Sequence, residues 1–155
     1  MIPLPWFSFG ASSAIVTSLG LIVGFAAANA STATILGALL IVALADNLTD
    51  SLSIHIYQES ERLAPRAVFR GTLTNFATRL TVSLSFVLLV FSLPVEYALP
   101  VAVIWGLLLL ATLTCLVARR RRVSMARELW RHLAAAVLVL AVSRIVGVLI
   151  LSRLH

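Results

Sequence analysis

Two carboxylates within a mostly apolar stretch are the residues of this sequence best suited to chemistry. Asp46 and Asp50 are four residues apart in the segment from about residue 34 to residue 57. This spacing puts both side chains on one face of a helix, and Ser53 and Tyr57 continue that face. Carboxylate oxygens bind divalent cations, and they also carry protons in relays. The pair therefore predicts a metal site or a proton relay.

Two basic residues in other apolar stretches are possible partners for these acids. Arg79 shares a helix face with Thr72, Asn75 and Ser83, and it lies at about the depth of Asp46 if consecutive segments are antiparallel. Arg144 belongs to the last apolar stretch, and the two acids and two bases sum to zero formal charge. Asp46, Arg79 and Arg144 could therefore pair structurally. Asp50 has no obvious partner at its own depth, which favours a functional role.

The overall composition indicates the environment in which these residues lie. The chain has 155 residues, of which 61% are hydrophobic and 12% charged, and its mean hydropathy is +1.05. A soluble domain has about 25% charged residues, and a soluble fold of this length could not bury so many apolar side chains. The composition excludes a soluble enzyme, a DNA-binding domain and a disordered chain. It predicts an integral membrane protein whose main partner is the lipid bilayer.

Hydrophobic stretches long enough to cross a bilayer divide the chain into five spans joined by short connections. We predict an all-α bundle of five transmembrane helices in one domain, residues 1–155. The expected spans are residues 8–28, 34–57, 67–93, 98–118 and 129–151, each within a few residues.

The basic residues predict the orientation of the bundle. All 12 are Arg, and nine of them cluster in the second and fourth connections, at residues 62–70 and 119–131. Such connections belong on the cytoplasmic side, so we expect a cytoplasmic N-terminus and an external C-terminus in a multi-pass protein, in a cytoplasmic membrane of the bacterial type. Arg clusters between membrane spans are not typical of a nucleic-acid site, and no nucleic-acid partner is expected.

Gly20 and Gly24 form a GxxxG segment in the first span. Small residues on one helix face allow another helix to approach closely. The segment predicts helix packing, either within the chain or between the two copies of a homodimer.

The first two spans resemble the vacuolar iron transporter family, which includes the yeast vacuolar iron and manganese carrier and plant nodulin-like relatives. The resemblance rests on residues 9–24 (FGASSAIVTSLGLIVG) and 45–57 (ADNLTDSLSIHIY), and more weakly on residues 143–147 (SRIVG). It implies a five-helix homodimer that exports Fe²⁺ or Mn²⁺ from the cytosol in exchange for protons. The pathway would lie between the subunits, along the first two spans.

The resemblance also implies a set of metal-binding positions. Asp46 matches the family pattern, whereas Ser13 replaces a family Asp and Asp50 replaces a family Met. A carboxylate in place of a thioether favours harder ions such as Mn²⁺ or Mg²⁺. Ser13 and Thr17 would add weaker oxygen ligands, and two acids would form the cytoplasmic mouth: Glu59 and Glu61. The family's metal-binding domain after the second helix is absent, because only about residues 58–66 connect the two spans.

Three functions remain open from the sequence. The first is transport of Fe²⁺ or Mn²⁺, with the metal as substrate and no resident cofactor. The second is a structural or regulatory membrane subunit derived from the same family that transports nothing. The third is transport of an anion held by Arg79 or Arg144. An enzyme is not expected, because the chain has no motif for nucleophilic or metal-assisted catalysis.

Overall fold

The structure is a computed structural model that describes the backbone of residues 4–154 and the side chains of residues 7–94 and 96–153. In this part of the chain every regular element is a helix. The elements are α1 (Leu4–Ala27), α2 (Thr32–Ile41), the π-helix η1 (Val42–Asp46), α3 (Asn47–Ser60), α4 (Pro65–Ser92), α5 (Val95–Arg121) and α6 (Met125–Leu154).

Five helical segments are long and apolar enough to cross a membrane, which confirms the predicted fold class. They are Phe7–Ala27, Thr32–Ser60, Pro65–Ser92, Glu96–Arg121 and Met125–Arg153. The second segment combines α2, η1 and α3. The boundaries extend several of the predicted spans by a few residues, because the helices continue into the connections.

Local signals in the sequence explain where the helices begin and end. Ser31 caps α2, since its side chain accepts a hydrogen bond from the backbone N–H of Thr34. Pro65 begins α4, where a missing N–H costs nothing. Asn29, Arg62 and Arg122 have positive φ values of 53°, 55° and 53°, and each reverses the chain just after a helix.

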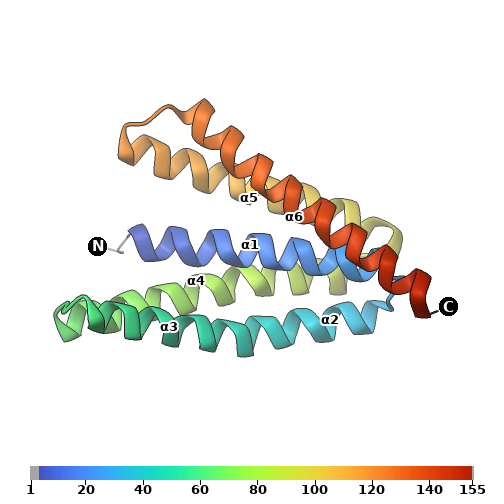
Figure 1. The fold of residues 1–155 in the computed structure, drawn as a ribbon, viewed down its shortest axis with the longest axis horizontal. Helices are drawn as coiled ribbons and strands as arrows, with labels where there is room; N and C mark the ends of the chain where they lie inside the picture. Colours follow the sequence, from blue (N-terminus) through green and yellow to red (C-terminus); the bar gives the residue numbers. More distant parts are fainter. Residues whose placement is uncertain (1–3, 155) are drawn as a thin grey trace.

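The helices run up and down the bundle, so the two Arg-rich turns lie at one end (Figure 1). This end, called the Arg-rich end below, also contains the beginning of α1. The end of α6 lies at the opposite end with the α1–α2 and α4–α5 turns. Positive-inside bias would put the Arg-rich end in the cytosol.

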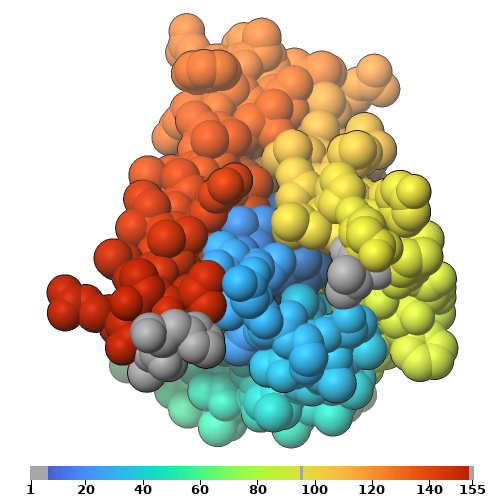
Figure 2. Space-filling view, turned by 90° about the vertical axis from the view of Figure 1, so that its right-hand side faces the viewer, coloured from blue at the N-terminus to red at the C-terminus, as the bar shows by residue number. Residues whose placement is uncertain are grey.

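Helix α1 is the centre of the bundle and packs against α2, α4, α5 and α6. Figure 2, which faces the end opposite the Arg-rich end, shows α1 surrounded by its neighbours. The α5–α6 hairpin diverges from α1 toward the Arg-rich end (Figure 1). The buried face of α4 changes along its length, from Asn75, Arg79 and Ser83 to Phe86 and Val90. Polar residues therefore occupy the middle of its buried face, and apolar core its last two turns.

The GxxxG segment of α1 packs against α6 of the same chain. A Cβ atom added to Gly20 would lie 3.1 Å from Ser143 Oγ, and one added to Gly147 would lie 2.2 Å from the backbone oxygen of Gly24. Only a small residue fits at these positions. The close approach is thus an intrachain contact, whereas the dimer role considered for Gly20 and Gly24 stays a prediction.

Candidate functional site

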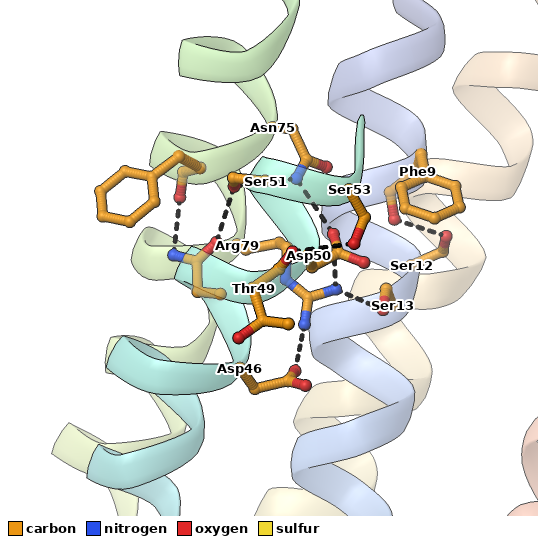
Figure 3. Close-up of polar contacts among 12 residues, drawn as sticks. Phe9, Ser12, Ser13, Asp46, Thr49, Asp50, Ser51, Ser53, Asn75 and Arg79 are labelled. Atoms are coloured by element: carbon orange, nitrogen blue, oxygen red, sulfur yellow. Dashed lines mark hydrogen bonds and ion pairs between the residues drawn. The ribbon is translucent and has the colours of Figure 1, made fainter. Parts of the chain in front are cut away.

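Arg79 is the centre of a charged cluster halfway along α4. Its side chain is only 3% exposed, and it forms ion pairs with Asp46 and Asp50 (Figure 3). The Nη1–Oδ2 distance to Asp50 is 3.3 Å, and Nη1 also donates a hydrogen bond to Ser13 Oγ. The Asp46–Arg79 pair that the sequence suggested is present. The expectation that Asp50 has no partner is wrong, because the long Arg79 side chain reaches both acids.

A layer of amides and hydroxyls holds the acids between α3 and α4. Asn75 Nδ2 donates to Asp50 Oδ2 at 3.1 Å and to Ser51 Oγ at 3.3 Å. Asn47 Nδ2 donates to the backbone oxygen of Phe76 at 3.0 Å. Asn47, Ser51 and Asn75 are buried, so these bonds form in a low-dielectric interior. The sequence placed Asn75 on the face of Arg79, but Asn47 and Ser51 were not predicted to join it, although their four-residue spacing was a usable signal.

The π-helix η1 ends at Asp46, directly beside the cluster. A π-turn contains one residue more than an α-helical turn. The helix that precedes it is therefore rotated by about 100° relative to a continuous α-helix. Such turns are found frequently at functional sites. After this turn the Asp46 side chain is 48% exposed and that of Asp50 25% exposed. The acids therefore extend from the buried Arg79 to the outer surface of the chain.

Gly10 allows α1 to approach α4 beside the cluster. A Cβ atom at Gly10 would lie 2.7 Å from Asn75 Oδ1 and 2.9 Å from the backbone oxygen of Asn75. Ser13 follows Gly10 by about one turn, which brings its hydroxyl to Arg79. The close contact of α1 with α4 thus supplies the third helix of the site.

Several buried polar atoms of the bundle, including one on Asn75 and one on Arg79, have no hydrogen-bond partner among the described residues. They are Asn75 Oδ1, Arg79 Nε, Ser18 Oγ and both amide atoms of Gln58. An unpaired buried polar group is costly, and in proteins water or a ligand normally satisfies it. The interior beside α4 therefore has unused capacity to bind water or an ion.

The remaining residues proposed from the sequence lie apart from the cluster. Thr17 is half-buried on α1, and no polar contact in the described part of the chain joins it to the acids. Glu59 and Glu61 are exposed near the Arg-rich end, where Glu59 Oε1 lies 3.5 Å from His55 Nε2. The described residues contain no group of three or more His, Cys, Asp or Glu side chains that could hold a metal ion.

The pairing expected for Arg144 is wrong. Arg144 is exposed on α6, and it forms no ion pair within the described residues. Helix α6 packs against α1 and α5 rather than α3. Its neighbour Ser143 faces α1, so Arg144 points away from that contact.

The position of Arg144 changes the charge balance of the site. Two carboxylates share one guanidinium, so the cluster has a formal charge of −1 instead of zero. An uncompensated charge in the middle of a membrane span is unfavourable by several kcal/mol. A bound proton or cation would remove this cost.

Comparison with protein-family models, curated proteins and solved structures found no match to the chain. The resemblance to the vacuolar iron transporter family therefore stays a prediction that rests on residues of the first two spans.

Proposed function

We propose that the protein is a membrane transporter that removes a divalent metal ion, Fe²⁺ or Mn²⁺, from the cytosol, and that Asp46 and Asp50 bind the ion. The observation that carries this proposal is the pair of carboxylates that share one guanidinium in the middle of the second and third spans. A cation neutralises the excess negative charge. A proton does the same, so the two can exchange at one site.

The donor atoms around the cluster favour a hard cation. Asp46 and Asp50 offer carboxylate oxygens, and Ser13 offers a hydroxyl. Asn75 offers an amide oxygen that has no hydrogen-bond partner among the described residues. Sulfur and imidazole ligands are not part of this set. Oxygen donors suit Mn²⁺ and Mg²⁺ better than softer ions. Of the two proposed substrates, Mn²⁺ therefore fits the site better.

The charge of the cluster supports a homodimer as the transporting unit. One divalent ion on a single cluster of charge −1 would leave an excess of +1. Two clusters from two copies of the chain have a total charge of −2 and balance one divalent ion. Asp46 is half-exposed, and Thr49 and Ser53 extend the polar surface beside it. A second copy packed on this surface would bring the two clusters together.

Arg79 acts in this proposal as the counter-ion of the empty site. Its guanidinium contacts both acids and keeps them within the protein when no metal is bound. Metal binding requires at least one of these ion pairs to break. The Ser13 hydroxyl and Asn75 Oδ1 would then stabilise the displaced guanidinium and the ion.

The test is Mn²⁺ uptake by proteoliposomes that contain the purified full-length protein and a metal-sensitive dye. Asp50→Asn keeps the shape of the side chain but removes its charge, and we expect the initial rate to fall at least about tenfold. Glu96→Gln is the matched control, since Glu96 is an exposed acid on α5 outside the cluster. An unchanged rate in Asp50→Asn, measured beside an active wild type, would contradict the proposal.

A non-transporting structural or regulatory subunit is the second candidate. It is favoured by the contact of Arg79 with both acids, which closes the cluster to cations unless an ion pair breaks. This candidate predicts no metal uptake by well-folded protein and a stoichiometric partner that co-purifies with it. The same contacts argue against an anion site at Arg79, because the acids already occupy its guanidinium.

A further inference from the structure

A groove lies between α1, α5 and α6 near the Arg-rich end. It has a volume of about 530 Å³, and it follows from the divergence of the α5–α6 hairpin from α1 (Figure 1). Its apolar wall includes Val16, Leu110 and Leu113, whereas Arg121 and His132 contribute charge and polarity. The groove therefore combines an apolar surface with a basic group.

The polar groups of the groove are suited to an anion. Arg121 ends α5 within a run of four arginines, and no acidic residue lines the groove. Arg121 forms no ion pair with the described residues, whereas Arg131 lies 3.3 Å from Glu128. His132 Nδ1 lies 2.9 Å from the hydroxyl of Thr114, which is 2% exposed. This contact holds the ring against α5 and leaves Nε2 available to a ligand.

The length of the groove matches one leaflet of a bilayer. Leu110 and Arg121 are eleven residues apart on one helix, which corresponds to about 16 Å along its axis. Half of the hydrocarbon core is about 15 Å. An acyl chain that entered beside Arg121 would therefore end near Leu110.

A second groove of similar volume has an apolar surface but no basic residue in its lining. It lies between α1, α4 and α5, has a volume of about 570 Å³ and is lined by Thr74, Thr78 and Thr81 among apolar residues. No charged residue lines it. Of these two grooves, the one with Arg121 offers a partner for an anionic headgroup.

We propose that the groove between α1, α5 and α6 is a binding site for an anionic phospholipid. The phosphate contacts Arg121 at the mouth of the groove, and His132, which lies at the level of Thr114, offers Nε2 to the ester oxygens of the lipid. One acyl chain lies along Val16, Leu110 and Leu113. This site is separate from the charged cluster, since it uses the opposite neighbours of α1. Basic pockets between membrane helices on the cytoplasmic side are a recognised form of anionic-lipid site.

The test measures lipid affinity of the full-length protein in neutral detergent by native mass spectrometry. We expect phosphatidylglycerol to bind more tightly than phosphatidylcholine. Arg121→Gln should weaken phosphatidylglycerol about fivefold, the effect of one basic residue at the headgroup. Arg120→Gln is the matched control, because it removes the same charge from the same turn but does not line the groove. It should change the affinity less than twofold.

One further variant and a soluble ligand distinguish binding in the groove from diffuse electrostatic attraction to the Arg-rich end. Ala135→Phe fills the groove without changing charge and should also weaken phosphatidylglycerol. Glycerol phosphate, which has no acyl chain, should not compete at concentrations equal to the lipid. Equal losses in Arg121→Gln and Arg120→Gln, no effect of Ala135→Phe, or competition by glycerol phosphate would each overturn the proposal.

Discussion

At the scale of single residues, two arginines within the spans have different environments. Arg79 is buried and contacts two acids, whereas Arg144 is exposed on α6 and contacts neither. The sequence indicated that Asp46 and Arg79 lie at one depth, because charge and helical position are enough for that inference. It could not show that Asp50 shares the same guanidinium or binds Asn75, since both contacts depend on side-chain reach and on how α3 rotates against α4.

This difference predicts unequal effects of the same substitution. Arg79→Gln leaves two carboxylates without a base, and we expect it to lower the free energy of unfolding by about 3–5 kcal/mol, the typical cost of breaking a buried ion pair. Arg144→Gln should change it by less than about 0.5 kcal/mol, as for surface substitutions. Thermal unfolding in one detergent checks both. A larger loss of stability in Arg144→Gln than in Arg79→Gln would contradict the assignment of Arg79 as the buried partner of the acids and Arg144 as an exposed residue.

At the scale of elements, helix contacts depend on small residues whose partners the sequence does not identify. The GxxxG segment predicted a close contact of the first span, and the structure places α6 of the same chain there. The π-helix η1 was not predictable, because residues 42–45 are apolar on all sides and their periodicity carries no signal. A helix surrounded by lipid has no strict polar face. An extra residue in such a helix therefore causes no visible shift in the pattern of polar and apolar residues.

Two glycine substitutions test the packing of the elements. Gly147→Ala would put a Cβ atom 2.2 Å from the backbone oxygen of Gly24, so α1 and α6 must separate. We expect a loss of about 1–3 kcal/mol, the usual cost of overpacking. Gly37→Ala is the control, because nothing lies within 4 Å of its added Cβ atom. It should be neutral or stabilise the helix by up to about 1 kcal/mol. Equal unfolding temperatures for the two variants would disprove the α1–α6 contact.

At the scale of the whole molecule, hydropathy was sufficient to predict five spans, because a long apolar segment has few alternatives to crossing the bilayer. The divergence of the α5–α6 hairpin was not predictable. It depends on how α1 packs between its neighbours, and no single segment encodes that packing. The groove at Arg121 is therefore visible only in the assembled bundle.

The up-and-down arrangement predicts which connections share a side of the membrane. In a Cys115→Ser background, cysteines at Ser60 and Ser124 should react with an impermeant thiol reagent from the same side, since both turns lie at the Arg-rich end. A cysteine at Asn29 should react only from the other side. Labelling of Ser60 and Ser124 positions from opposite sides would rule out this topology.

In the proposed transporter the acids of the charged cluster bind a cation and do not merely neutralise Arg79. Crystals of the full-length protein soaked in Mn²⁺ test it directly by anomalous scattering. The proposal predicts a peak beside Asp50, between two copies of the chain, with Arg79 displaced from at least one acid. Crystals that show no peak at Mn²⁺ concentrations well above the expected affinity, with Arg79 still in contact with both Asp46 and Asp50, would contradict it.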